Sequence, residues 1–415
     1  MNREWMRASK IVGLSVLALW VTSAYADWTQ VGGNAAHNAY IPVELSHDLR
    51  LDWYQSIAGG SQSVVIAGGS LFASSANYNG DHILQSLDAA TGSKKWSTSL
   101  GSDAWALGSP TYGDGKVFVQ APGSADFRGY VTTNAYNATT GALTQTSHAY
   151  GSNGLGPFIS AYSGGVLYFN VGAPTGALYS TNMTTGGTTA LSYFNGGADG
   201  TAPAILGDQV VDFQKDTLRV FDRSSGGMVK AISAPTLIPG SSAVSVATPV
   251  LSGQYAFAIS QERLLTFDLM QGTVAWTRSG AQSNIVVDGL EAFVVLNGQL
   301  ASINVKDGSI NWTKSLDGQR LGMQLIVTDN TIFVEGASSN YGSLRTFVLD
   351  RQTRDQLFSV DGGRLAWSDD HLYVATDSGI AAFDAIAVPE PSMWLMMVAG
   401  AMALVAARRQ LGIAR

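Results

Sequence analysis

Leu87-Asp88-Ala89-Ala90-Thr91-Gly92-Ser93-Lys94-Lys95-Trp96 is the stretch that decides the fold. Asp88 follows an apolar strand residue, Gly92 lies four positions later and Trp96 eight positions later. An Asp side chain accepts N–H bonds from the turn that follows it, and Gly supplies the left-handed conformation that closes a hairpin. The stretch therefore predicts two β-strands joined by a tight turn.

The same spacing recurs along the chain, with anchors on average about 42 residues apart, which is a typical length for a propeller blade. The seventh unit differs because it has an arginine where the others have glycine. The anchors are Asp88 with Gly92, Asn137 with Gly141, Asn182 with Gly186, Asp222 with Gly226, Asp268 with Gly272, Asn304 with Gly308, Asp350 with Arg354, and Asp384.

Large rings recur eight residues after several anchors, at Trp96, Trp276, Trp312 and Phe358. Rings at one blade position are expected to pack between neighbouring sheets. Turns that lead into β-branched strands precede the anchors, and no long amphipathic helix is predicted between residues 27 and 387. The pattern indicates an all-β repeat protein.

The last unit stops at Asp384 without the outer strand that carries a ring. Near the start, residues 49–56 form such a strand around Trp53, without a unit of their own. We expect this strand to complete the last sheet, because closure removes exposed sheet edges. The prediction is an eight-bladed β-propeller, or a seven-bladed one if the irregular stretch near Asn182 is not a full blade.

Residues 87–96 resemble the repeat of the PQQ-like, quinoprotein-dehydrogenase-like β-propellers, and residues 28–37 resemble their N-terminal lead-in. The resemblance covers roughly residues 28 to 385. It implies the fold, but the superfamily includes dehydrogenases, outer-membrane assembly scaffolds and secreted proteins of other roles, so it does not imply one function.

The composition of the chain excludes several classes of function. The chain has 415 residues, 46% of them apolar and 13% charged, 47 glycines, no cysteine and a formal net charge of −7. The absence of cysteine excludes disulfides, thiolate metal sites and a cysteine nucleophile. The negative charge argues against a nucleic-acid partner.

Residues 1–26 have the order of a secretory signal peptide: three basic residues, an apolar run over 11–21, and the small residues Ala24 and Ala26 before a cleavage site. The alternative, a permanent anchor, is disfavoured because eleven apolar residues are too short to cross a bilayer.

At the other end, Pro389-Glu390-Pro391 precedes sixteen uncharged residues, 392–407, and then Arg408 and Arg409. Sixteen residues make about 24 Å of helix, marginal for a membrane span. The basic tail is expected in the cytoplasm and the preceding chain outside. Removing both ends leaves 18 bases and 30 acids, a net charge of −12 for the exported part.

This order resembles the PEP-CTERM sorting signal of exopolysaccharide-producing Gram-negative bacteria, over about residues 388 to 409. The resemblance implies transient insertion in the inner membrane and recognition by an exosortase, a membrane-embedded cysteine transpeptidase. The alternative is a plain C-terminal anchor. The predicted domains are a signal peptide (1–26), a propeller (27–387) and a sorting signal (388–415).

No catalytic, cofactor-binding or metal-binding residue is assigned. The disulfide typical of quinone-dependent dehydrogenases of this superfamily is impossible here, so the repeat is not expected to bind PQQ. The five histidines, His37, His47, His82, His148 and His371, lack metal-ligand spacing and are interpreted as surface or turn residues. Residues 77–81 lack the distal Glu of a calcium loop, and residues 151–156 lack a P-loop lysine.

Two functions remain. The first is an exported, non-catalytic binding or scaffold module of the envelope or extracellular matrix, with exopolysaccharide or envelope proteins as partners. The second is an enzyme, either a divergent quinoprotein or a polysaccharide-modifying enzyme with carboxylates at the propeller channel.

Overall fold

The computed structural model describes residues 27–384 with internal gaps. Two predicted segments lie outside the described residues: the signal peptide, with Ala24 and Ala26, and the sorting signal, with its transmembrane helix. Residues 77–81 and 151–156 also lie outside them. The gaps are 58–62, 76–81, 102–106, 123–129, 151–158, 173–174, 196–200, 215, 236–244, 317–318, 338–342 and 370.

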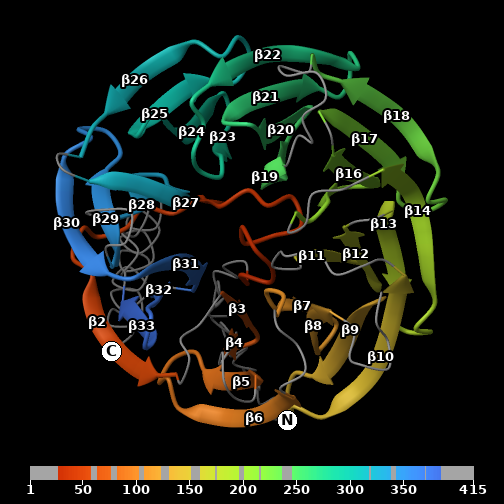
Figure 1. Ribbon diagram of the computed structural model, residues 1–415. Helices are drawn as coiled ribbons and strands as arrows, with labels where there is room; N and C mark the ends of the chain where they lie inside the picture. Colours follow the sequence, from red (N-terminus) through yellow and green to blue (C-terminus); the bar gives the residue numbers. More distant parts are fainter. Residues whose placement is uncertain are drawn as a thin grey trace, which may run out of the picture.

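Eight sheets stand around a central axis, so the chain is an eight-bladed β-propeller (Figure 1). Seven of the sheets have four antiparallel strands. The remaining sheet, blade 7, has four antiparallel strands and a short fifth strand, β1 (Tyr40–Ile41), which pairs with β27 in parallel. The stretch around Asn182 forms a complete blade, which confirms eight blades rather than seven. In the described part of the chain, no helix is long and apolar enough to cross a membrane.

Within each blade the strands follow the chain from the axis outward. Blades 1 to 4 consist of β3 (Val64–Ala67), β4 (Ser70–Ser75), β5 (His82–Asp88) and β6 (Lys94–Gly101); β7 (Thr111–Gly113), β8 (Lys116–Pro122), β9 (Tyr130–Asn137) and β10 (Leu143–Tyr150); β11 (Ser160–Ser163), β12 (Val166–Val171), β13 (Thr175–Asn182) and β14 (Thr188–Asn195); and β15 (Ala204–Leu206), β16 (Gln209–Gln214), β17 (Thr217–Asp222) and β18 (Met228–Ser233).

Blades 5 to 8 continue the ring in the same order, except that the outermost strand of blade 8 comes from the start of the chain. They consist of β19 (Ser245–Ser252), β20 (Tyr255–Ser260), β21 (Arg263–Asp268) and β22 (Thr273–Ser279); β23 (Val286–Asp288), β24 (Glu291–Leu296), β25 (Gln299–Asn304) and β26 (Ile310–Lys314); β27 (Arg320–Thr328), β28 (Thr331–Ala337), β29 (Leu344–Asp350) and β30 (Gln356–Asp361); and β31 (Gly363–Ser368), β32 (His371–Ala375), β33 (Gly379–Asp384) and β2 (Arg50–Ser56).

The ring closes as the sequence predicts. Strand β2 pairs antiparallel with β33, with Trp53 opposite Ala382 and Ser56 opposite Gly379. One sheet thus joins the two ends of the described chain. Opening the ring would expose the edges of both strands, because β33 has no other partner on that side.

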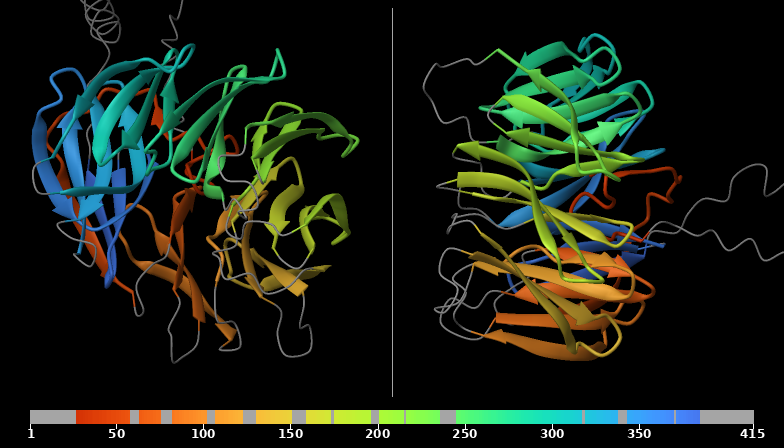
Figure 2. Two further views of the ribbon diagram at one scale, coloured as in Figure 1. Left: turned by 45° about the horizontal axis from the view of Figure 1, so that its top comes forward. Right: turned by 90° about the vertical axis from the view of Figure 1, so that its right-hand side faces the viewer.

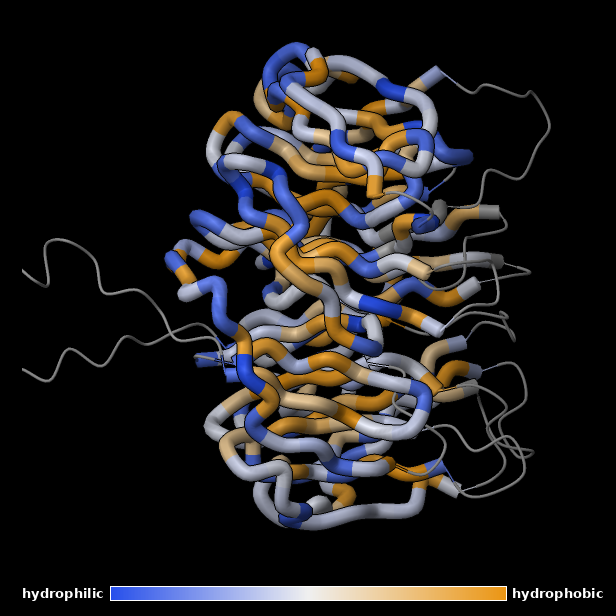
Figure 3. The backbone as a smooth tube through the Cα atoms, turned by 90° about the vertical axis from the view of Figure 1, so that its left-hand side faces the viewer, coloured by the Kyte–Doolittle hydropathy of each residue, from blue (hydrophilic) through white to orange (hydrophobic). Residues whose placement is uncertain are grey.

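The core lies between the blades. The second strand of a blade is buried on both faces, as in β20 with Phe257 and β24 with Phe293, both fully buried. Outer strands alternate between exposed and half-buried residues, as in β22. Figure 3 shows hydrophobic segments through the middle of the ring.

The two faces of the ring differ. One face, here the turn face, carries the turns between the first and second strands and the Asx turns between the third and fourth. Asp27 lies there, since its carboxylate accepts from Gly68 N, and so does Asp384 at the end of β33. Figure 2 shows residues 27–45, in red, on this face. Both ends of the described chain therefore leave from one side of the ring.

Candidate functional site at the channel mouth

The N-terminal lead-in, residues 27–45, runs across the centre of the ring on the turn face (Figure 1). Its backbone carbonyls accept N–H bonds from the innermost strands of successive blades. The bonds are Ile66 N to Trp28 O (2.8 Å), Tyr112 N to Thr29 O (2.7 Å), Ile205 N to Ala35 O (2.6 Å), Leu251 N to Ala36 O (2.9 Å) and Val327 N to Ala39 O (3.2 Å).

Two amide side chains bind the remaining blades of this series. Gln30 donates to Tyr162 O at 3.1 Å and accepts from Tyr162 N at 2.9 Å. Asn38 does the same with Val287, at 2.9 Å in both directions. Each amide satisfies a buried N–H and a buried C=O together, as a paired strand would. The lead-in thus bonds blades 1 to 7 in order and continues into β2 of blade 8.

His37 belongs to the lead-in and is buried, at 2% exposed. Its Nδ1 is 2.6 Å from Val31 O, and its Nε2 is 3.1 Å from Pro203 O in blade 4. Burial lowers the pKa of His37, against the opposing effect of the two carbonyls. The interpretation of all histidines as surface or turn residues is therefore wrong for His37, and also for His82, which is 4% exposed. The described residues contain no group of three side chains able to hold a metal ion.

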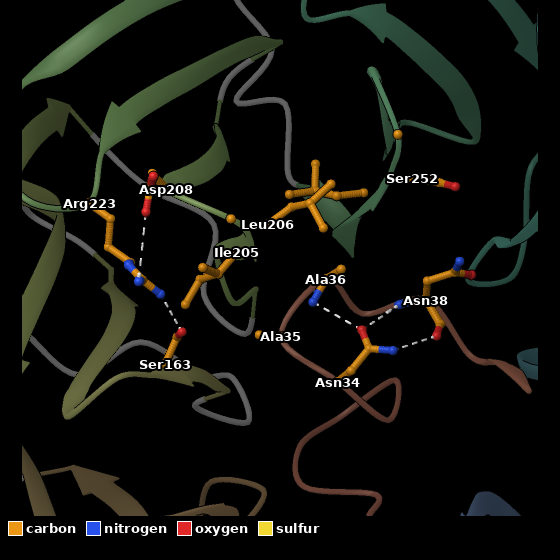
Figure 4. Close-up of a pocket in the computed structure, with 13 residues that line it drawn as sticks. Asn34, Ala35, Ala36, Asn38, Ser163, Ile205, Leu206, Asp208, Arg223 and Ser252 are labelled. Atoms are coloured by element: carbon orange, nitrogen blue, oxygen red, sulfur yellow. Dashed lines mark hydrogen bonds and ion pairs between the residues drawn. The ribbon is translucent and has the colours of Figure 1, made fainter. Parts of the chain in front are cut away.

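A cavity of about 660 Å³ lies beside the lead-in, between blades 3, 4 and 5 (Figure 4). The Asn34 amide shapes one wall, because its Oδ1 accepts from Ala36 N at 3.0 Å and its Nδ2 donates to Asn38 O at 2.9 Å. The opposite wall comes from the ends of β11, β15 and β19, with Ser163, Leu206 and Ser252.

Arg223 supplies the positive charge of this cavity. Its guanidinium donates to Ser163 Oγ at 2.5 Å and lies 3.9 Å from a carboxylate oxygen of Asp208. The Arg223 side chain is 32% exposed, whereas Asp208 is 90% exposed, so their ion pair is weak. The same arginine lines a second cavity of about 240 Å³ between blades 3 and 4. These walls offer amide, hydroxyl and guanidinium groups, which suit a polar ligand.

The predicted turn residues take up a common geometry on the turn face. In the first seven units the N–H four residues after the anchor donates to the anchor's backbone carbonyl, at 2.8 or 2.9 Å. The anchor side chain accepts from the turn as well; for example, Asn137 Oδ1 accepts from Thr139 N at 3.0 Å and Thr140 N at 2.9 Å. Asp384 ends β33, and the residues after it are not described.

The predicted tryptophans lie against the turn of the next blade. The indoles of Trp53, Trp96 and Trp276 donate to Ala89 O (3.0 Å), Ala138 O (2.9 Å) and Val305 O (2.7 Å). Their rings lie against Gly92, Gly141 and Gly308, where an added Cβ would come within 2.6 Å of the ring. Glycine is thus required at these turns for close approach as well as for its positive φ.

The fourth tryptophan, Trp312, faces the one unit without a turn glycine. Arg354 takes that position with a positive φ of 65°. Its guanidinium carbon lies 5.2 Å from the centroid of the Trp312 ring, a cation–π geometry. The exception in the repeat therefore keeps the contact between blades 6 and 7 by a different chemistry.

The structure separates the residues that were predicted from those that line the cavity. The turn residues and tryptophans lie around the ring, where they join blades. Gln30, Asn34, Asn38 and Arg223 were not singled out from the sequence. The partners of Gln30 and Asn38 lie 132 and 249 positions away, so no local spacing could reveal them.

Two family models match this chain, one over the propeller and one at its C-terminal end. A family model described as outer membrane protein assembly factor BamB matches residues 50–314, well over half of the chain. The chain belongs to this family. A second model, the PEP-CTERM protein-sorting motif, matches residues 387–410. No curated protein matches the sequence.

Solved propellers share the architecture of this family member. BamB from Moraxella catarrhalis superposes with a TM-score of 0.58 at 15% identity, over 81% of this chain and 97% of that one. The C-terminal WD40 domain of Sif2 gives 0.57 at 12% identity, over 84% and 99%. Sqt1 from Saccharomyces cerevisiae gives 0.55 at 10% identity, over 81% and 98%. At these identities the likeness shows the fold alone.

The family and the sorting motif together indicate an exported, envelope-associated propeller. The motif also implies processing by an exosortase. The PQQ-like repeat and the PEP-CTERM motif expected from the sequence are thus confirmed.

Proposed function

We propose that this protein is a non-catalytic binding module of the bacterial envelope or extracellular matrix, delivered through its C-terminal sorting signal. The observation that carries the proposal is the lead-in across the channel mouth, with its bonds to seven blades. A segment with that many bonds is costly to displace, so ligands are expected to meet the rim and the faces of the ring.

The chemistry around the channel mouth supports binding rather than catalysis. The larger cavity is lined mainly by amide, hydroxyl and small apolar groups, and Asp208 is its single carboxylate. In blades 6 and 7, Asp288 and Glu291 bind the guanidinium of Arg351, at 2.6 and 3.1 Å. These acids therefore stabilise the ring, whereas general acid–base work needs a carboxyl group that can reach a substrate.

The proposed partners are exopolysaccharide or other envelope components. A relative in the family is named for outer-membrane protein assembly, and a rigid ring that presents loops suits such scaffold work. Of these partners, a polysaccharide fits the uncharged surface of blades 2 and 3 best.

Thermal unfolding with PQQ and Ca²⁺ tests the proposal against the enzymatic alternative. Any ligand that binds the native state raises the unfolding temperature by mass action. We expect the midpoint of the purified propeller to stay unchanged with PQQ and Ca²⁺, together or singly. A saturable rise with PQQ would contradict the proposal and favour a divergent quinoprotein.

A further inference from the structure

One sector of the ring has no charged side chains. Residues 129–198 form a run of 70 residues without a single Asp, Glu, Lys or Arg, although 13% of the whole chain is charged. At that average, such a run would contain about nine charged residues. It contains instead 12 threonines and 7 of the 15 tyrosines of the chain.

This run folds into β9 to β14, the outer half of blade 2 and the whole of blade 3, which we name the uncharged sector. The blades lie side by side at the rim (Figure 1), and their outer strands β10 and β14 are in contact. Half-buried or exposed polar side chains line the outer strands of blade 2, including Thr132, Asn134, Thr144 and Thr146. The surface thus offers hydroxyls and amides.

Tyrosines gather at one end of the sector. Tyr150 and Tyr193 are 61% and 70% exposed, which is unusual for large rings. Tyr130 packs edge-on against Tyr150, with ring centroids 5.4 Å apart, and against His148 at 6.4 Å. These contacts fix the Tyr150 side of the group before any ligand arrives.

A buried tyrosine interacts with both exposed tyrosines. The hydroxyl of Tyr179 donates to Tyr150 O at 2.6 Å and also interacts with the hydroxyl of Tyr193. Burial, and to a smaller extent Tyr193, raises the pKa of Tyr179, so this hydroxyl stays protonated as a donor. The hydrogen bond from Tyr179 therefore holds the backbone at Tyr150, one member of the tyrosine platform, here Tyr130, Tyr150 and Tyr193.

The platform lies away from the ends of the described chain. Tyr130 begins β9, and Tyr150 ends β10, so both lie at the strand ends opposite the Asx turn at Asn137. Asp384 lies on the turn face, close in sequence to the sorting motif that begins at residue 387. A protein held at that end would present the platform away from its attachment.

From these observations we infer that the uncharged sector binds a neutral polysaccharide, with sugar rings stacked on Tyr150 and Tyr193. The inference rests on the proposed binding function and names its ligand class. Rigid tyrosines supply a flat apolar surface at low entropic cost and keep a polar edge. The surrounding hydroxyls and amides match a polyhydroxylated chain.

The charge of the sector disfavours an anionic polymer and a protein as partners. An anionic polymer needs cations, and the run itself has none, while the exported part carries a net charge of −12. Protein interfaces are enriched in arginine as well as in tyrosine. Three cations from outside the run border the sector: Arg219 lies 5.8 Å over the Phe194 ring, Arg223 donates to Ser163 Oγ, and Lys116 donates to Met183 O.

Affinity electrophoresis of the folded, exported protein tests the inference. The gels contain dextran, laminarin or galactomannan as neutral polymers, and polygalacturonate as the anionic control. We expect retardation by at least one neutral polymer, unchanged by added NaCl because no ion pair is involved. Tyr150→Ala with Tyr193→Ala should weaken binding at least tenfold, and Tyr193→Phe should retain it because the ring remains.

Leu143→Ala is the matched control, since Leu143 is 55% exposed at the other end of β10; it should bind as the parent does. Unchanged unfolding midpoints establish that each variant is folded. Binding to polygalacturonate alone, salt-sensitive binding, or no retardation by any neutral polymer would overturn the inference.

The remaining outcomes separate this inference from the broader proposal. If neutral-polymer binding survives the double substitution, the tyrosine platform is not the binding site, and the proposed binding function remains supported. Loss of a dimer in the double variant would make a second copy of the chain the occupant, which also overturns the inference. The PQQ experiment tests the broader proposal whatever the result here.

Discussion

At the scale of single residues, the joints between blades depend on tryptophan rings that lie on turn glycines. Gly92 has a φ of 69°, and a Cβ there would lie 2.5 Å from the Trp53 ring. Gly115 has nearly the same φ, 71°, with nothing within 4 Å of an added Cβ. Comparing substitutions at the two glycines therefore separates two contributions to the loss of stability: the strain of a left-handed backbone and the clash with the Trp53 ring.

We therefore expect Gly92→Ala to destabilise the protein more than Gly115→Ala. Both substitutions place a side chain in the left-handed region, at a cost of about 1–2 kcal/mol. Only Gly92→Ala also pushes against Trp53, which adds about 1–3 kcal/mol. Urea unfolding of the two variants measures the difference. Equal losses would mean that the ring contact contributes nothing.

A buried carboxyl group gives a second test at this scale. Asp212 in β16 is fully buried; its Oδ1 accepts from Asn170 Nδ2 at 2.8 Å, and its Oδ2 has no hydrogen-bond partner in the described part of the chain. Burial raises the pKa of Asp212 above its ordinary value of 3.8. The folded protein thus holds this proton more tightly than the unfolded chain does.

It follows that Asp212 favours the folded state at low pH, and that this advantage is lost as the pH rises through its folded pKa. Asp212→Asn removes the ionisation and keeps the shape. We expect the variant to be more stable than the parent by about 1–3 kcal/mol at pH 8, with a smaller gain near pH 4. Unfolding midpoints across that range check this, and a gain that does not change with pH would argue against a buried ionisable Asp212.

At the scale of elements, the lead-in acts like a strand: it bonds to the innermost strands of blades 1 to 7, to some through its backbone carbonyls and to others through amide side chains. Asn38 is the test position, because its amide alone pairs the N–H and C=O of Val287, which is 2% exposed. Removing one partner of a buried pair costs more than the bond itself contributes, since the other groups stay unpaired.

Asn38→Ala should therefore cost about 1–3 kcal/mol and speed hydrogen exchange at the Val287 amide. Gln55→Ala is the control, because among the described residues the Gln55 amide bonds only to the carbonyl of the adjacent Ser56. Exchange of the Val287 amide is the direct readout. Unchanged protection in Asn38→Ala would show that the lead-in does not depend on this amide.

The elements also show how far sequence reasoning reaches. Asx and Gly at fixed spacing predicted the blade turns, because turn chemistry is local, and the ringed strand around Trp53 predicted the closure with β33. The paths of Gln30 and Asn38 across the channel could not be predicted, because their partners come from distant blades. His37 was misjudged for the same reason: the carbonyl of Pro203 lies 166 positions away in sequence.

At the scale of the whole molecule, the closed ring separates two faces. The turn face has the lead-in and both ends of the described chain, and the opposite side of blades 2 and 3 has the tyrosine platform. This polarity suits a protein delivered or held through its C-terminal end while its far face meets a polymer. The net charge of −12 is expected to keep the exported part soluble and away from polyanions.

In the function that we propose, the propeller is exported, sorted through its C-terminal signal and active outside the cell. Intact-mass measurement of the protein recovered from the envelope and the medium tests this most directly. We expect a chain that begins near Asp27 and has lost the residues beyond about Pro391. Full-length protein that retains Arg415, or protein recovered only from the cytoplasm with residues 1–26 attached, would contradict the claim.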